Sequence, residues 1–249
     1  MPITKVSVVT PIHNESSNIP ELVERIEKTM EAWRARESGR EWEHLACDDH
    51  SSDGSLELLQ KLAETHPRLK PVRNPKRSGQ TGGFETGFRN ATGDVVVTMD
   101  ADLQNQPEDI PVLLKPIEEG RLDLVNAIRT RRQHAGSLIA ISKLGNWLIR
   151  RLMVCPVSDA ASNFTALKSS FAKDLTLVEN DHRYVIPIFV RRGMDPKRIG
   201  EANTRHEARK HGASKYSAIR KALTGFPELL RCKKRLSQGF YDWPKKSND

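Results

Sequence analysis

The sequence predicts an α/β fold in which one mostly parallel β-sheet carries helices on both faces. Short runs rich in β-branched residues alternate with longer segments whose apolar residues recur every three or four positions. Repeated strand–helix units of this kind build parallel sheets. The 249 residues, 37% of them hydrophobic, are enough to bury a substantial core. We therefore place one large domain at residues 1–212 and a basic amphipathic helical extension at residues 213–249.

Five segments are predicted as strands because each is short and apolar, with β-branched residues in most of them. Such runs are typical of buried strands. In chain order they are residues 5–11 (KVSVVTP), 44–49 (HLACDD), 69–74 (LKPVRN), 95–100 (VVVTMD) and 122–128 (LDLVNAI).

Four segments between these strands are predicted as helices. The segment at residues 107–118 begins with a proline, which is common at the start of a helix. Residues 55–62 and 80–89 are the two shorter helices. The longest covers residues 19–33, where one face is apolar through Leu22, Ile26, Met30 and Trp33.

Polar and acidic side chains follow three of the predicted strands. Ligands of open α/β sheets bind beyond the carboxyl ends of the strands, so we expect these side chains to share one crevice. A lone Asp-x-Asp is more often a solvated loop or a helix cap, and its coincidence with two other acidic strand ends is what favours a site. The residues are Asn14 and Glu15, then Asp48 and Asp49, then Asp100 and Asp102.

Gathered carboxylates repel one another unless a cation or a donor-rich ligand lies between them. Oxygen ligands suit Mg²⁺ or Mn²⁺, which bind one or two carboxylates together with substrate phosphates. The chain has neither a GxxxxGK[ST] loop nor a GxGxxG turn after a strand. We therefore predict a nucleotide diphosphate whose charge is neutralised by Mg²⁺ or Mn²⁺ and by side chains.

The cysteines and the distribution of charge bear on where the protein acts and on what it can bind. Cys47, Cys155 and Cys232 match neither zinc-site spacing nor a disulfide framework, and no apolar run reaches the roughly 18 residues of a membrane span. The net charge is +8, and the chain from Arg205 to Lys246 carries twelve Lys or Arg against three Asp or Glu. Basic clusters attract nucleic acid, anionic lipid or phosphorylated substrates, and charge alone does not choose among them.

Five segments of the chain carry recognisable motifs: VVTPIHNE, CDDHSSDGS, SGQTGGFETGF, GDVVVTMDADLQNQPEDIP and HGASKYS. Together they resemble family 2 glycosyltransferases with the GT-A fold. The resemblance is strongest to the polyprenyl-phosphate sugar transferases, the group that holds dolichol-phosphate mannose synthase and the undecaprenyl-phosphate glycosyltransferases. It runs over roughly residues 5–225.

The resemblance implies a role for each strand end. Asp49 would accept hydrogen bonds from the base of a nucleotide-diphosphate sugar, and Gln104 would lie near the sugar or the metal. Asp100 and Asp102 would hold the divalent metal against the diphosphate. The nucleoside pocket would be lined by Pro11, Asn14 and Glu15.

The resemblance also implies an inverting transfer to a lipid phosphate. A phosphate monoester is mostly dianionic at neutral pH, so the acceptor needs cations that orient it rather than a general base. Arg209 lies in a segment matching R-x-x-G-x-SK, which would fold over the diphosphate. The acceptor phosphate would be contacted by Arg129, Arg132, Ser142 and Lys143.

Four positions depart from the family pattern: His13, Leu138, Ala161 and Thr165. Two of the departures remove basic contacts that relatives carry. A GT-A transferase with a soluble or other acceptor therefore stays open as an alternative. The base and the sugar of the donor also stay open, because discrimination between epimeric hydroxyls depends on loop geometry.

Two basic amphipathic stretches, residues 138–154 and 216–236, predict peripheral attachment to the anionic cytoplasmic face of a membrane. Phe240, Tyr241 and Trp243 are candidate interfacial anchors. Two alternatives are that the apolar faces pack on the core and that a membrane subunit recruits the protein. A nucleic-acid-binding protein is disfavoured, because the aromatic residues are not interleaved with the basic ones.

Overall fold

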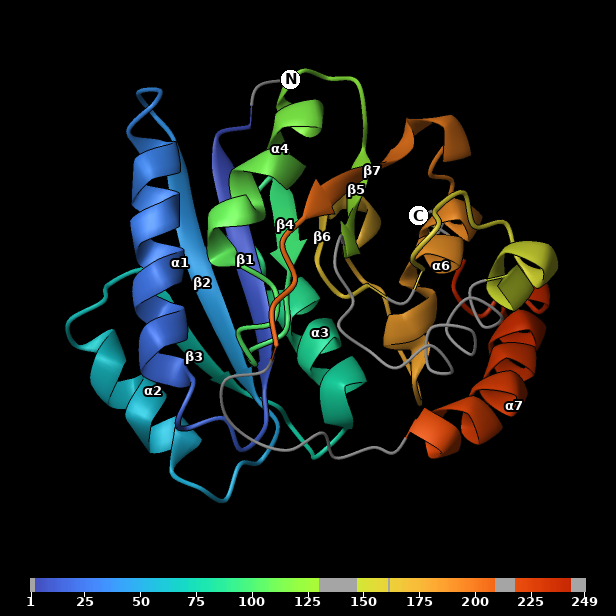
Figure 1. Cartoon of the computed structure of the whole chain (residues 1–249), viewed down its shortest axis with the longest axis horizontal. Coiled ribbons are helices and arrows are strands. Elements are labelled where there is room, and N and C mark those ends of the chain that lie inside the picture. The colour runs from blue at the N-terminus through green and yellow to red at the C-terminus, as the bar shows by residue number, and fades with distance from the viewer. Residues whose placement is uncertain (1–2, 130–146, 161, 209–217, 243–249) are drawn as a thin grey trace, which may run out of the picture.

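The computed structural model describes residues 3–129, 147–160, 162–208 and 218–242, apart from the side chains of Arg129 and of residues 218–224. Its centre is a seven-stranded sheet in the order β3-β2-β1-β4-β6-β5-β7. All neighbouring strands are parallel except β6, which is antiparallel to both β4 and β5. The prediction of a mostly parallel sheet flanked by helices is confirmed, with one reversed strand inside it (Figure 1).

All five predicted strands are present, and two further strands were not predicted. The missed strands are β6 and β7: the first has only four residues, and the second, IGEANT, has little apolar character. The strand predicted at residues 95–100 ends at Thr98, which leaves Asp100 in the following loop. The strands are β1 Lys5–Ile12, β2 Glu41–Asp48, β3 Leu69–Arg73, β4 Val95–Thr98, β5 Leu124–Arg129, β6 Thr165–Lys168 and β7 Ile199–Thr204.

The four predicted helices are confirmed, although the last begins with a 3₁₀ turn at Pro107–Asp109. Further 3₁₀ turns lie at Ser169–Phe171, Asp181–Tyr184 and Pro196–Arg198. A helical segment at residues 147–152 precedes β6. The labelled helices are α1 Ile19–Arg34, α2 Ser55–Ala63, α3 Gly79–Asn90, α4 Ile110–Glu118, α6 Val185–Arg191 and α7 Ala218–Ser237.

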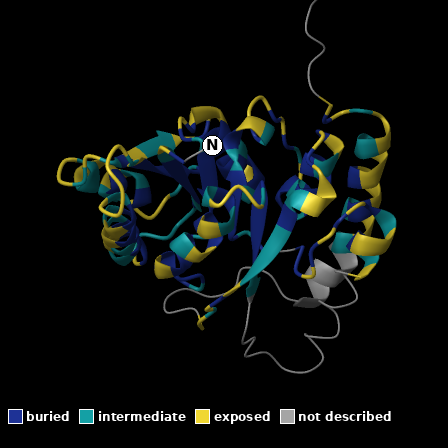
Figure 2. Ribbon diagram, turned by 90° about the horizontal axis from the view of Figure 1, so that it is seen from above, coloured by how far each residue is buried: buried dark blue, intermediate teal, exposed yellow. Residues whose placement is uncertain are grey.

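Each face of the sheet has its own core, because neighbouring strand residues point to opposite faces. Val8 belongs to the core under α1 and α4. Its neighbour Val9 belongs to the core under α3, α6 and α7. Figure 2 shows the buried residues concentrated in the strands between these two layers. The sheet is therefore covered on both sides, as parallel sheets require.

Helix α3 lies unusually close to β1 because it presents glycines to it. A Cβ added at Gly83 would lie 2.6 Å from Cβ of Pro11, and one added at Gly87 would lie 2.1 Å from Cγ1 of Val9. Distances this short essentially never occur between carbon atoms that are not bonded to each other. The glycines of SGQTGGFETGF thus allow close helix–strand packing at the start of the predicted site.

Replacing Gly87 by alanine is expected to lower the free energy of unfolding by about 1–2 kcal/mol. Overpacking costs about 1–3 kcal/mol, and the gain in helix propensity offsets up to about 1 kcal/mol of it. Gly225→Ala in α7 is the matched control, because its added Cβ meets nothing within 4 Å. Urea unfolding measures both variants. Equal stabilities would contradict the close approach of α3 to β1.

The C-terminal helix is part of the fold. Leu229, Cys232 and Tyr241 are buried in the core that α3 and α6 also line. The expectation that Tyr241 serves as an interfacial anchor is wrong, because its side chain is only 1% exposed. Pro227 lies inside α7, where packing outweighs the local cost of a proline. The predicted domain boundary at residue 212 lies outside the described residues.

Candidate active site

The loops after β1, β2 and β4 leave the sheet at one edge, the lower edge in Figure 1. These strands are adjacent and parallel, with Ile12 opposite Asp48 and Val9 opposite Thr98. The three acidic or polar strand ends predicted to share a crevice therefore do lie along the same edge.

The loops after β1 and β2 are joined by hydrogen bonds. Asn14 has a left-handed φ of 56°, its backbone N–H donates to Oγ of Ser51, and its side-chain oxygen accepts from the backbone of Ser52. The backbone of Glu15 donates to Oγ of Ser55. Pro11 packs against Gly83 of α3. Asn14 and Glu15 thus lie in one cross-linked loop unit, while Pro11 lies at the end of β1 just before it, and the contact of all three residues with a nucleoside stays a prediction.

Asp49 is buried and organises the connection from β3 to α3. Its Oδ1 accepts from Nδ2 of Asn74 at 2.8 Å and from the backbone of Ser78 at 2.7 Å, and its Oδ2 accepts from the backbone of Gly79 at 2.8 Å. A carboxylate has about four acceptor positions. Its predicted bond to a nucleotide base would thus be added to a structural role that the sequence did not reveal.

Asp53 adds a fixed negative charge beside these loops. Burial disfavours its charged form, but hydrogen bonds from Ser55 and Ser16 outweigh that effect and lower the pKa of Asp53 to about 2. Its carboxylate is therefore ionised at neutral pH and ties the start of α2 to the loop after β1.

Asp100 and Asp102 lie in the loop after β4. The carboxylate of Asp100 accepts from Nε2 of Gln80 at 2.5 Å and from Nδ2 of Asn163 at 3.2 Å. Asp102 is buried, and its Oδ1 accepts from the backbone of Gln104 at 3.1 Å. Leu103, between Asp102 and Gln104, takes a left-handed φ of 59°. The Asp-x-Asp is therefore a defined turn whose carboxylates are held by specific donors.

The chain after β7 runs along this loop, a contact that could not be predicted from the sequence. The backbone of Glu207 donates to the carbonyl of Gln104 at 2.9 Å, and Nε2 of Gln104 donates to the carbonyl of Glu207 at 3.3 Å. Arg205 pairs with Asp109 at the start of α4, with Nη2 2.8 Å from Oδ1. Gln104 is thus fixed between the acidic loop and the segment that leads toward Arg209.

The predicted acceptor residues are only partly covered by the structure. Strand β5 is antiparallel to β6, which is antiparallel to β4, so β5 ends at the same edge as β4. Arg129 is the last residue of β5 and its backbone therefore lies at the edge that carries the acidic loop. The predicted contacts of four further residues lie outside the described part of the chain: Arg132, Ser142, Lys143 and Arg209.

The residues at this edge fit a Mg²⁺ or Mn²⁺ ion that is shared with a substrate. The described residues contain no group of three or more His, Cys, Asp or Glu placed to hold a metal by themselves. Two carboxylates in one turn, Asp100 and Asp102, are instead the donor set of ions that also take water and phosphate oxygens. The fit is thus to a metal that binds together with a diphosphate.

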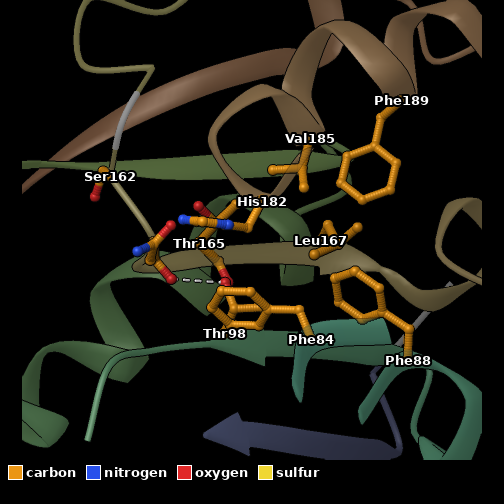
Figure 3. Close-up of a pocket in the computed structure, with 10 residues that line it drawn as sticks. Phe84, Phe88, Thr98, Ser162, Thr165, Leu167, His182, Val185 and Phe189 are labelled. Carbon is orange, nitrogen blue, oxygen red and sulfur yellow. Dashed lines mark hydrogen bonds between the residues drawn. The ribbon is translucent and has the colours of Figure 1, made fainter. Parts of the chain in front are cut away.

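A small cavity lies between α3, β6 and α6 (Figure 3), and Asn163, which donates to Asp100, is among the residues that line it. Its volume is about 10 Å³, room for no more than one water molecule. At its polar end Nδ1 of His182 bonds Oγ1 of Thr81 at 2.7 Å. The cavity is too small for a sugar or a lipid. Its apolar walls are Phe84, Phe88, Leu167, Val185 and Phe189.

A family model and several named proteins match this sequence. The model of glycosyl transferase family 2 matches residues 7–176. Undecaprenyl-phosphate 4-deoxy-4-formamido-L-arabinose transferases from Salmonella paratyphi B and Salmonella newport are 35% identical over 220 residues, or 88% of this chain. The chain spans 64% of the length of these relatives.

Solved structures share the fold at low sequence identity. Mannosyl-3-phosphoglycerate synthase from Rubrobacter xylanophilus matches with a TM-score of 0.71 and 15% identity over 98% of this chain and 77% of its own. Glucosyl-3-phosphoglycerate synthase from Mycobacterium tuberculosis, in complex with Mn²⁺, UDP and glucosyl-3-phosphoglycerate, matches with a TM-score of 0.66 and 18% identity over 94% and 79%. The family model alone covers more than half of the sequence, and the chain belongs to glycosyl transferase family 2.

Proposed function

We propose that this protein transfers a sugar, with inversion, from a nucleotide-diphosphate sugar to a polyprenyl phosphate at a membrane surface. The observation that carries the proposal is the meeting of three strand ends at one sheet edge, with the Asp100–Asp102 turn among them. Membership of glycosyl transferase family 2 supports the reaction class. The 35% identity to undecaprenyl-phosphate transferases supports the acceptor class.

The residues along this edge of the sheet would have different roles in the reaction. The loop unit of Asn14, Glu15 and Asp49 would receive the nucleoside, and Asp100 with Asp102 would hold Mg²⁺ or Mn²⁺ against the diphosphate. The metal supplies stabilisation of the charge that develops on the leaving diphosphate. Gln104, fixed by Glu207, would lie beside the transferred sugar. Arg129, at the same edge, would orient an acceptor phosphate, which is nucleophilic without a general base.

A second candidate acceptor is a small soluble phosphate ester. The observation that favours it is the fold match to synthases whose named products are 3-phosphoglycerate glycosides. These matches are only 15% and 18% identical, whereas the transferases named for undecaprenyl phosphate are 35% identical. The lipid acceptor is therefore the primary proposal.

The test is a transfer assay. Nucleotide sugars are first screened for thermal stabilisation of the protein with Mn²⁺, because a ligand that binds the folded state raises its melting temperature. The best donors are then incubated with Mn²⁺ and either undecaprenyl phosphate in detergent or 3-phosphoglycerate, and the glycosylated product is measured. Product on the lipid alone is expected. Product on 3-phosphoglycerate alone would transfer the assignment to the soluble acceptor, and product on neither acceptor would overturn the proposed function.

Two described surfaces support the membrane location. Trp147 and Val154 are 58% and 63% exposed, and Phe226 and Leu230 of α7 are 47% and 45% exposed. Exposed basic residues accompany both pairs: Arg150, Arg151, Arg231, Lys233 and Lys234.

The opposite sides of these two helical segments pack on the core through residues such as Ile149 and Leu229. One face of each segment therefore packs on the core, and we propose that the exposed face lies on an anionic bilayer. None of the helices described in the structure is long and apolar enough to cross a bilayer.

Reversing three charges on α7 is expected to release the protein from vesicles. Each Lys or Arg near an anionic surface contributes about 1 kcal/mol, so Arg231→Glu/Lys233→Glu/Lys234→Glu should lose most co-sedimentation with anionic liposomes at low salt. Arg235 is left unchanged because it is bonded to buried Asp181. The control Lys28→Glu/Arg36→Glu/Lys61→Glu has the same change in net charge, on exposed residues of the α1–α2 region. Equal binding by both triple variants would contradict a specific membrane-facing surface.

A further inference from the structure

The carboxylate of Asp100 is held between two neutral amides. Nε2 of Gln80 donates to Oδ1 at 2.5 Å, and Nδ2 of Asn163 donates to the same oxygen at 3.2 Å. The donors come from sequence positions 20 and 63 residues away. Two donors from different elements fix both the position and the orientation of a carboxylate that a single donor would leave free to rotate.

Each amide is itself held in place. Gln80 is in the first turn of α3. The two residues before it, Ser78 and Gly79, donate backbone hydrogen bonds to buried Asp49. Asn163 is fixed by its backbone, because its carbonyl accepts from Oγ1 of Thr98 at 2.8 Å, at the end of β4. Gln80 is thus anchored to the loop that follows β2, and Asn163 is anchored to the end of β4, the strand that precedes Asp100.

The chemistry of the donors suits a carboxylate that binds a cation. A Lys or Arg at either position would donate the same hydrogen bond, but its positive charge would repel a divalent ion bound to the same carboxylate. An amide orients the carboxylate without adding charge. Donors around a metal-binding carboxylate commonly set metal affinity by factors of about 10–100.

We propose that Gln80 and Asn163 are positioning residues, which hold Asp100 in the orientation that binds the divalent ion and thereby set the affinity of the protein for Mn²⁺. This inference rests on the proposed function, because it takes Asp100 as a metal ligand. It assigns to both amides a role that is separate from contact with the substrate.

The experiment measures Mn²⁺ binding directly, by the loss of the free Mn²⁺ signal in electron paramagnetic resonance, with UDP present and absent. Gln80→Leu and Asn163→Leu are each expected to raise the Mn²⁺ dissociation constant by about 10–100-fold. Asn90→Ala is the matched control, because Asn90 ends the same helix and its side-chain amide donates to the carbonyl of Thr86. It should bind Mn²⁺ as the unaltered protein does.

Gln80→Lys separates positioning from a merely structural role. Lysine can still donate to Asp100, so a structural role would be preserved and the melting temperature would stay near that of the unaltered protein. Its charge should nevertheless weaken Mn²⁺ binding at least as much as Gln80→Leu does. Normal Mn²⁺ affinity in Gln80→Lys, or in both leucine variants, would overturn the inference while leaving the proposed function in place. Absence of Mn²⁺ binding by the unaltered protein would instead remove the metal site itself.

Discussion

Replacing Asp102 by asparagine is expected to lower the rate of sugar transfer by about 100-fold or more. Metal ions supply several kcal/mol of charge stabilisation in the transition state, and each 1.4 kcal/mol, approximately, is a factor of ten in rate. Asparagine keeps an oxygen that can accept from the backbone of Gln104, as Asp102 does at 3.1 Å. The turn should therefore survive while the negative charge is lost. Product formation at saturating donor measures the effect.

Asp94→Asn is the matched control for this experiment. Asp94 precedes the same strand, β4, but at its amino end, where its carboxylate accepts from Thr4 and Lys5. Its pKa is lowered because these hydrogen bonds outweigh the effect of burial, so the variant loses some stability but no site residue. Transfer should stay within a few-fold of normal. Full activity in Asp102→Asn, or activity of the unaltered protein in excess chelator, would contradict the metal assignment.

Replacing Asp181 by alanine is expected to lower the free energy of unfolding by about 3–5 kcal/mol. Asp181 is fully buried, and its carboxylate accepts from Nη2 of Arg235 at 2.5 Å and from the hydroxyl of Tyr241 at 2.6 Å. Removing one partner of a buried ion pair costs about this much, although Arg235 keeps a longer ion pair with Glu179 at 3.4 Å. The cluster joins the 3₁₀ turn before α6 to α7 and to the chain that follows it. Its loss should therefore loosen the C-terminal helix.

Deprotonation of Tyr241 is not expected to open this cluster. Burial raises the pKa of the Tyr241 hydroxyl well above its usual range, and the carboxylate of Asp181 raises it further. Tyr241 therefore stays protonated and keeps donating at any pH used for an assay.

Asp242→Ala is the control for Asp181→Ala. Asp242 pairs with Arg191 at 2.6 Å, and both side chains are substantially exposed. Exposed pairs contribute about 0–1 kcal/mol. Urea unfolding should separate the two variants clearly, and proteolysis should cut the region around α7 faster in Asp181→Ala. A small effect of Asp181→Ala, comparable with the control, would show that the C-terminal helix is held by its apolar contacts alone.

The sheet edge was predictable because it follows from local patterns. Strands β1, β2 and β4 are apolar runs that end in polar residues, and parallel strands place such ends together. The missed strands β6 and β7 lack this signal. Strand β6 has only four residues. The prediction of repeated strand–helix units also did not include an antiparallel strand between β4 and β5.

The support of the site was not predictable from the sequence. Gln80 and Asn163 reach Asp100 only after the chain has folded, and nothing near either residue marks it as a partner. The same holds for Asp49, whose carboxylate binds three donors 25–30 residues away. The stretch after α7 that contains Tyr241 likewise resembles a solvent-exposed tail. The contact of Tyr241 with Asp181 could not be predicted, because the two residues are 60 positions apart in the sequence.

Anomalous X-ray diffraction at the manganese edge, from crystals grown with Mn²⁺ and the nucleoside diphosphate that stabilises the protein best, tests the proposed site most directly. We expect one strong peak within about 2.1 Å of a carboxylate oxygen of Asp100 or Asp102, in contact with the diphosphate. The nucleoside is expected in the loop unit of Asn14 and Asp49. A diphosphate bound at another edge of the sheet, or one bound here with no manganese peak at these carboxylates, would contradict the proposed site.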